Sequence, residues 1–268
     1  MLLQSLTILN KAESTLKFFR LLSEQEKKPT KEFHREHGLQ LPFDSHQVFA
    51  WLLTGFPCIC FFSFQYQTLT SNYRYFFTIL FLIFYFMGVV LFLYATLERH
   101  PYIEQVNPDT IHFCKYCCKN VPNTSKHCRM CNKCRIGFDH HCRYINNCVT
   151  ISNYNQFYFG TLSFVLAGVL GIVSIVLVMN AGTEVVISRI SSVYSIRLTK
   201  VWYWVAISIA LLLNLGLVIP LLVLVYFHVL FQSKNITTFD YIINSTENFP
   251  VQLQSFACSN EKISSFRI

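Results

Sequence analysis

The fold of this chain is decided by residues 114–148, which read CKYCCKNVPNTSKHCRMCNKCRIGFDHHCRYINNC. In this Cys/His segment, cysteines with two residues between them recur as C-x2-C pairs and alternate with histidines. This pattern is typical of structural zinc sites. In a small secreted protein so many cysteines would indicate disulfides, but C-x2-C pairs mixed with histidines favour metal in a reducing compartment. We therefore expect the segment to fold around metal ions.

Eight side chains of the Cys/His segment can form two four-coordinate sites, the usual coordination number of structural zinc. The first expected site uses Cys114, Cys117, His127 and Cys134, and the second uses Cys128, Cys131, His141 and Cys148. Spacing alone also permits a sequential pairing of the same residues. The segment has few large apolar side chains, so two bound zinc ions would supply its folding free energy. Saturated sites leave no open position for a substrate, so both ions should be structural.

One cysteine of the segment, Cys142, is left over beside two groups that could activate it. His140 can take the thiol proton or stabilise the thiolate, as in other Cys–His nucleophiles. Asp139 can orient the imidazole and favour its charged form. The alternative interpretation is a spare thiol beside a packing histidine.

The segment lies between apolar stretches that predict a membrane protein. Hydrophobic residues make up 53% of the chain and charged residues 13%, against about 25% charged in a typical soluble domain. Each of four apolar segments reaches or exceeds the roughly 20 residues that cross a bilayer. We expect an α-helical integral membrane protein with four transmembrane helices and a cytosolic zinc-stabilised domain between the second and third. The expected divisions are 1–46, 47–97 (first helix pair), 98–153 (cysteine-rich domain), 154–231 (second helix pair) and 232–268.

The positions of Lys and Arg predict the orientation. Seven lie in the N-terminal segment and eight in residues 98–153, whereas the loop 67–74 has one and the loop 181–200 has three. The positive-inside rule then places both termini and the cysteine-rich domain in the cytosol. The net charge of +8 is spread unevenly, and we expect no nucleic-acid partner.

The N-terminal segment allows two interpretations. Leucines and phenylalanines recur there at roughly helical spacing among basic residues, which fits an amphipathic helix on the membrane surface or a helix packed on the rest of the protein. Residues Met1 to Asn10 have no basic n-region and no cleavage site, so we expect no secretory signal peptide. No internal repeat is evident.

The Cys/His segment resembles the DHHC protein S-acyltransferases, the palmitoyltransferases. The string Asp139-His140-His141-Cys142 is similar to the motif that names the family, and Thr237-Thr238-Phe239-Asp240 is similar to its T-T-x-E element. The four-span layout is also similar, and the family's zinc pairing is the interleaved one given above. The resemblance covers about residues 47–245. Further matching stretches are Cys114-x2-Cys117, His127-Cys128-x2-Cys131-x2-Cys134, Asn146-Asn147-Cys148-Val149 and Asn153-Tyr154.

The resemblance implies a mechanism. Cys142 would attack the thioester of a fatty acyl-CoA such as palmitoyl-CoA, and the acyl group would pass to a cysteine of a substrate protein at the cytosolic membrane face. His140 would be the general base and Asp139 its orienter. The acyl chain would lie in a cavity among the four helices. Keeping it out of water would stabilise the bound chain by about 0.8 kcal/mol per methylene. The implied location is an endomembrane (Golgi or endoplasmic reticulum) or the plasma membrane.

The chain departs from the family pattern close to the nucleophile. The family usually has Pro-Trp after the catalytic cysteine, where this chain has Arg143-Tyr144. The usual glycine after Asn-Cys-Val is Thr150, and the T-T-x-E glutamate is Asp240. Arg143 adds charge where CoA phosphates could approach. These departures bear on rate and substrate choice more than on reaction type. The candidate acyl-CoA contacts are Lys133, Arg135, Arg143 and Tyr144.

Two other functions compete with the acyltransferase. The departures favour a catalytically weak or inactive zinc-stabilised membrane adaptor, while retention of Asp139, His140 and Cys142 argues against it. A transporter or channel is disfavoured because the spans lack the ionisable residues that mark an ion path. Ala167, Gly168 and Gly171 in the third span could line a deep acyl cavity, but close helix packing through small residues is the favoured interpretation.

Overall fold

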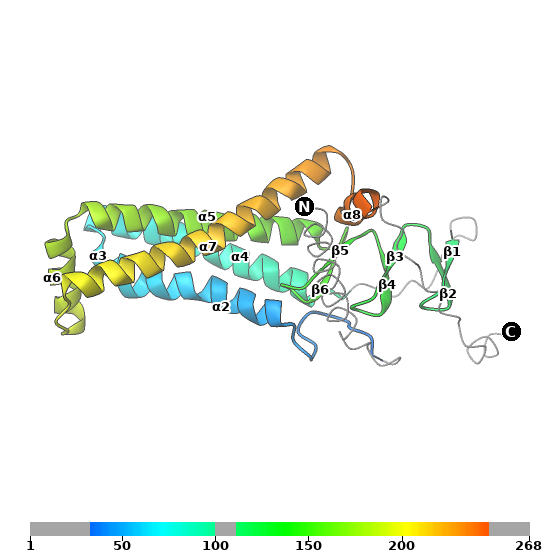
Figure 1. Ribbon diagram of the computed structural model, residues 1–268, viewed down its shortest axis with the longest axis horizontal. Helices are drawn as coiled ribbons and strands as arrows, with labels where there is room; N and C mark the ends of the chain where they lie inside the picture. Colours follow the sequence, from blue (N-terminus) through cyan, green and yellow to red (C-terminus); the bar gives the residue numbers. More distant parts are fainter. Residues whose placement is uncertain (1–32, 100–110, 247–268) are drawn as a thin grey trace, which may run out of the picture. The chain divides into compact units, whose positions relative to one another are not determined.

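Four long helices form a bundle from the apolar segments (Figure 1). The computed structural model describes residues 33–99 and 111–246. In these ranges four helices are long and apolar enough to cross a membrane, which confirms the expected four-helix architecture. The expected N-terminal amphipathic helix lies outside the described residues. The first span is α2 (Ser45–Cys60) continued by the π-helical turn Phe61–Gln65 and α3 (Tyr66–Thr68), and the others are α4 (Ser71–Leu97), α5 (Tyr154–Asn180) and α7 (Lys200–Ser233).

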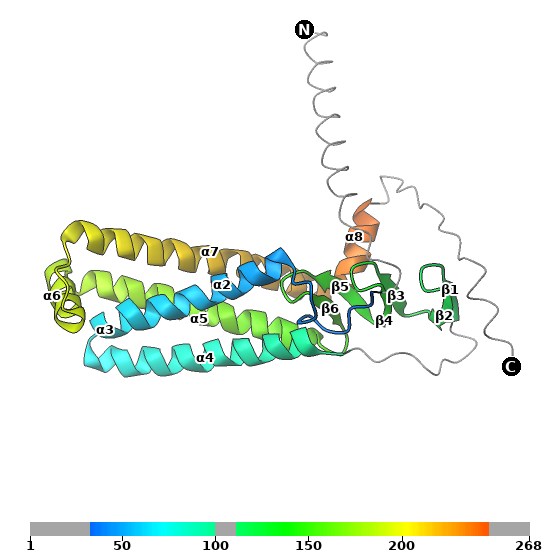
Figure 2. The same ribbon diagram turned by 90° about the horizontal axis from the view of Figure 1, so that it is seen from below.

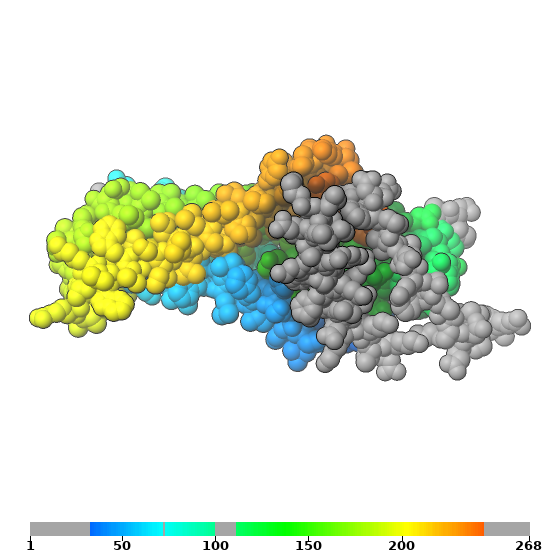
Figure 3. Space-filling view, in the orientation of Figure 1, coloured from blue at the N-terminus to red at the C-terminus, as the bar shows by residue number. Residues whose placement is uncertain are grey.

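Helix α5 packs closely on both α4 and α7, and its small residues make this approach possible. A Cβ added to Gly168 would lie 2.4 Å from Val218 Cγ2 of α7, and one added to Gly171 would lie 2.5 Å from Asn214 Oδ1. Both contacts are shorter than real Cβ atoms tolerate, so these glycines serve helix packing, as the favoured interpretation had it. The space-filling view shows α7 in yellow to orange over the face of the bundle, with α5 and α2 beside it (Figure 3).

Residues 181–200, expected to form a loop, contain a helix. Helix α6 (Thr183–Tyr194) packs on α3 and α7 at the end of the bundle away from the Cys/His segment (Figure 1). Val186 and Ile190, one turn apart, are buried there. Gly182 precedes the helix with φ of 90°, a conformation that glycine adopts without strain, and Ser195 ends it in the left-handed region. The helix was missed because it is short and polar on one side.

The Cys/His segment forms three antiparallel hairpins in the described part of the chain. Each first strand ends in a cysteine, and these three cysteines recur every fourteen residues at Cys114, Cys128 and Cys142. The segment therefore does hold a short structural repeat, contrary to expectation. The first hairpin is β1 (Ile111–Cys114) with β2 (Lys119–Pro122), the second is β3 (Ser125–Cys128) with β4 (Lys133–Ile136), and the third is β5 (Phe138–Cys142) with β6 (Asn147–Thr150).

The third hairpin joins the repeat to the bundle, and the second and first hairpins follow outward from it (Figure 2). The Asn147 amide donates to three carbonyls at the end of α4, those of Ala95 (3.1 Å), Thr96 (3.2 Å) and Glu98 (3.0 Å). The last carbonyls of a helix have no partner within it. Asn147 therefore caps α4 and fixes the third hairpin against the second span.

Candidate active site and metal centres

The structure brings together two groups of side chains that could hold metal ions. Within each group, the four ligand atoms all lie within 4.8 Å of one another. In cluster 1, Cys117 Sγ is 3.2 Å from His127 Nδ1 and 3.6 Å from Cys134 Sγ. Tetrahedral zinc with Zn–S bonds of about 2.3 Å separates its ligand atoms by about 3.7 Å, so the Cys3His sets fit this ion. Cluster 1 is Cys114, Cys117, His127 and Cys134, and cluster 2 is Cys128, Cys131, His141 and Cys148.

Strand register explains why the clusters interleave. In the second hairpin His127 lies opposite Cys134, and in the third His141 lies opposite Cys148. Directly opposed residues share one face of the sheet, so each pair presents two ligands side by side. The C-x2-C turn of the preceding hairpin supplies the other two. Each metal would therefore join two successive hairpins, and this is the interleaved one of the two pairings that spacing left open.

Cys142 belongs to neither cluster because the third hairpin departs from the repeat. Its position matches that of Cys114 and Cys128, the first ligands of the other two turns. Where those turns carry their second cysteine, the third has Ile145, which is fully buried. Ile145, Cys142, Ala95 of α4 and Phe157 of α5 form one apolar cluster with Val149. A membrane-side apolar contact thus takes the place of a metal ligand.

Asp139 and His140 form a charged pair beside this thiol. His140 Nδ1 lies 2.6 Å from Asp139 Oδ2, and the Thr238 backbone N–H donates to Asp139 Oδ1 at 3.0 Å. Burial alone would raise the pKa of Asp139, but these hydrogen bonds outweigh it and leave that pKa below its usual value. Burial would lower the pKa of His140, but interactions with Asp139 and Cys142 raise it to about 9. The pairing therefore favours the charged form of both groups.

The segment after α7 positions the amide that binds Asp139. Helix α8 (Thr238–Thr246) begins with a capping box. The Thr237 hydroxyl accepts from the Asp240 N–H at 3.0 Å, and Asp240 Oδ2 accepts from the Thr237 N–H at 3.3 Å and from its hydroxyl at 2.7 Å. The shorter carboxylate of Asp240 still closes the box. The capping box thereby fixes the first turn of α8, where the Thr238 N–H points at Asp139.

The part of the chain that runs from the first hairpin to helix α8 matches a known protein family. Residues 107–245 match the family described as DHHC palmitoyltransferase. The chain belongs to this family. It is an integral membrane protein with a DHHC domain and two Cys/His metal-binding clusters. No curated protein matches the chain.

His228 of α7, a residue with no predicted role, packs on His140. The rings of His140 and His228 lie 5.7 Å apart, and Phe157 is 5.5 Å from His140 and 5.4 Å from His228. The Tyr154 hydroxyl and His228 Nδ1 are 2.8 Å apart. The sequence signal for this role was a single histidine, His228, within the apolar stretch of α7. These side chains of α5 and α7 hold the His140 ring from the membrane side.

The four candidate acyl-CoA contacts of this DHHC domain lie in different surroundings. Arg135 is buried at 2% exposure against cluster 2, and it donates to the Arg35 carbonyl at 3.1 Å. Lys133 lies opposite Cys128 in the second hairpin. Arg143 and Tyr144 occupy the turn of the third hairpin. The Arg143 side chain is 42% exposed and Tyr144 as a whole residue is 45% exposed. Their role in acyl-CoA binding stays a prediction.

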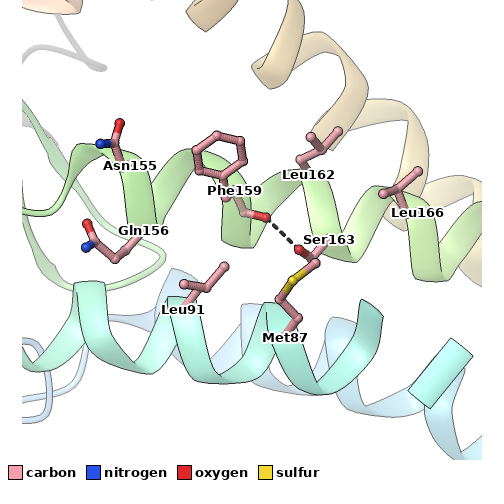
Figure 4. Close-up of a pocket in the computed structure, with 8 residues that line it drawn as sticks. All are labelled: Met87, Leu91, Asn155, Gln156, Phe159, Leu162, Ser163 and Leu166. Atoms are coloured by element: carbon pink, nitrogen blue, oxygen red, sulfur yellow. Dashed lines mark hydrogen bonds between the residues drawn. The ribbon is translucent and has the colours of Figure 1, made fainter. Parts of the chain in front are cut away.

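A groove of about 330 Å³ lies between two of the spans (Figure 4). Met87 and Leu91 line it from α4, and Phe159, Leu162 and Leu166 are among the residues that line it from α5. The Ser163 hydroxyl, which also faces it, donates to the Phe159 carbonyl of its own helix. Two helices form this groove, whereas the expected acyl cavity lies among four.

Proposed function

We propose that this chain transfers a fatty acyl group, palmitoyl above all, from acyl-CoA to cysteines of substrate proteins through an acyl-enzyme on Cys142. The observation that carries the proposal is the Asp139–His140 pair beside a thiol that belongs to neither metal cluster. Family membership supports the same reaction class.

The proposed reaction needs the Cys142 thiolate as nucleophile and His140 first as proton donor and then as proton acceptor. An imidazolium at His140, favoured by Asp139, stabilises the Cys142 thiolate. The thiolate attacks the thioester carbonyl, the C–S bond to CoA breaks, and the CoA sulfur takes the proton from His140. His140 then accepts a proton from the incoming substrate thiol, whose sulfur displaces Cys142 from the acyl group. Asp139 keeps the imidazole oriented throughout.

Two zinc ions would be held by clusters 1 and 2, where they would supply the folding free energy of the hairpins. Their ligand sets are complete, so the reaction would run on side chains alone. The acyl chain would extend from Cys142 into the bundle past Ala95 and Phe157, which share its apolar cluster, and Leu224, which packs against that cluster. Burial there would stabilise the bound chain by about 0.8 kcal/mol per methylene.

We place the hairpins and both termini in the cytosol, on the Lys and Arg distribution. The substrates would be proteins with a cysteine at that membrane face, in the Golgi, endoplasmic reticulum or plasma membrane. The alternative is a weakly active or inactive adaptor. Its main support was the departures at Arg143, Tyr144 and Asp240, and Asp240 still makes a complete capping box.

Autoacylation tests the proposal. Purified protein is incubated with labelled palmitoyl-CoA, and wild type is compared with Cys142→Ser. We expect label that hydroxylamine releases from wild type and that Cys142→Ser never acquires, with equal zinc content in both. Unlabelled wild type that is folded and zinc-loaded would favour the adaptor.

A further inference from the structure

The turn of the third hairpin is clamped by the segment that leads into the first span, residues 38–47. Arg143 Nε donates to Asp44 Oδ2 at 2.9 Å, across 99 positions of sequence. The next residue, Tyr144, packs edge-on against His46 with ring centroids 5.7 Å apart. This turn directly follows Cys142.

Asn146, in the same turn, adds further bonds to this segment. Its amide lies 3.4 Å from the Gly38 carbonyl, 3.3 Å from the Pro42 carbonyl and 3.3 Å from Gln47 Oε1. Gln47 in turn donates to the Gly38 carbonyl at 2.9 Å and is fully buried. The turn and the segment therefore meet through a connected set of hydrogen bonds.

Asp44 links this clamp to the membrane helix. It is the N-cap of α2, and its Oδ1 accepts from the His46 N–H at 2.8 Å and lies 3.0 Å from His46 Nδ1. Its other oxygen takes Arg143, so one carboxylate both starts the first span and anchors the turn. The Asp44 side chain is only 9% exposed, whereas that of Arg143 is 42% exposed. A charge-assisted pair with one buried partner is more specific than a fully exposed one.

The clamp occurs where the repeat lacks a metal ligand. The turns of the first and second hairpins carry Cys117 and Cys131, which belong to the metal clusters. The third turn has Ile145 at that position, and apolar packing, the Asp44 pair and the Asn146 hydrogen bonds hold it instead. We infer that Asp44, through Arg143, is a positioning residue that presents the Cys142 thiol to His140 in place of a metal clamp. The inference rests on the proposed function for its rate measurement only.

The variant Asp44→Asn tests this inference because it keeps the N-cap. Asparagine is as good an N-cap as aspartate and can still accept from the His46 N–H, but it removes the charge that holds Arg143. We expect single-turnover acyl-enzyme formation to fall by about tenfold or more, since small misplacements of reacting groups are costly. The KM for palmitoyl-CoA, zinc content and Tm should stay at wild-type values. Glu184→Gln, which breaks the exposed ion pair between Glu184 of α6 and Lys200 of α7, is the matched control and should be neutral.

The partner residue separates a clamp from a CoA contact. Arg143→Lys should retain most of the rate, Arg143→Ala should match Asp44→Asn, and the double variant Asp44→Asn/Arg143→Ala should lose no more than either single one. A wild-type rate in Asp44→Asn would overturn the inference. So would multiplicative losses in the double variant, or a raised KM in Arg143→Ala, which would indicate direct CoA binding.

Alkylation of Cys142 tests the role of Asp44 independently of the proposed function. Its rate with iodoacetamide, followed on the Cys142 peptide, reports how the thiol is presented whether or not acyl-CoA is a substrate. We expect it to be severalfold slower in Asp44→Asn than in wild type or Glu184→Gln. Wild type that alkylates but never acylates would remove the proposed function, and the same comparison would still decide the role of Asp44.

Discussion

At the scale of single residues, Asp139 joins the thiol chemistry to the rest of the protein. One of its oxygens binds His140 and the other binds the Thr238 amide of α8. Its side chain is 9% exposed, so the carboxylate depends on these partners for its charge. An acidic residue held in this way can fix both the orientation and the protonation of an imidazole.

Asp139→Asn is expected to slow acyl-enzyme formation by about 10²–10⁴-fold, the range that positioned acid–base groups contribute. The amide keeps the size of the carboxylate and an acceptor for Thr238, but it gives His140 no negative charge, so the pKa of His140 would fall. Single-turnover labelling with palmitoyl-CoA measures the rate, and metal analysis should find zinc unchanged. A rate within twofold of wild type would mean that Asp139 has no part in the reaction.

At the scale of elements, what could be predicted from the sequence depends on what stabilises each element. The four spans were predictable because long apolar runs become helices in a bilayer on their own. The hairpins were not, since their strands have only four or five residues and leave no alternating pattern. The amide of Thr238 could not be predicted because its contact with Asp139 spans 99 residues. The T-T-x-E-like string marked the place but gave no geometry.

The capping box of α8 gives a prediction at this scale. Asp240→Ala removes the acceptor of the Thr237 N–H, and loss of a cap costs about 1 kcal/mol. We expect first-turn amides of α8 to exchange hydrogen about fivefold faster and acyl-enzyme formation to slow severalfold, because the Thr238 N–H is then held less firmly. Asp240→Glu restores the usual capping residue and should behave as wild type. Unchanged exchange in Asp240→Ala would show that packing of α8 alone sets its position.

At the scale of the whole molecule, the bundle and the hairpins are stabilised by different means. The helices pack on one another through long apolar faces, as α5 does on α4 and α7. The strands of the hairpins pair only two by two, and isolated two-stranded sheets are at best marginally stable in water. The sequence predicted the ligand residues, but spacing alone left their pairing open and only the family resemblance implied the interleaved one, because pairing depends on the register that sets His127 opposite Cys134. The third hairpin, capped onto α4 by Asn147, is where the two parts meet.

Zinc removal should therefore separate the two parts. A chelator that strips both clusters is expected to abolish hydrogen-exchange protection in residues 111–150 and acylation of Cys142, while the helical circular dichroism of the spans persists. Cys131→Ser, which removes a fully buried ligand of cluster 2, should lose that metal, the protection of the third hairpin and acylation with chelator absent. Cys142→Ser should keep full zinc and full protection, since that thiol belongs to neither cluster. Hairpins that stayed protected after both metals had left would mean that their own packing, with the bundle behind it, is enough to fold them.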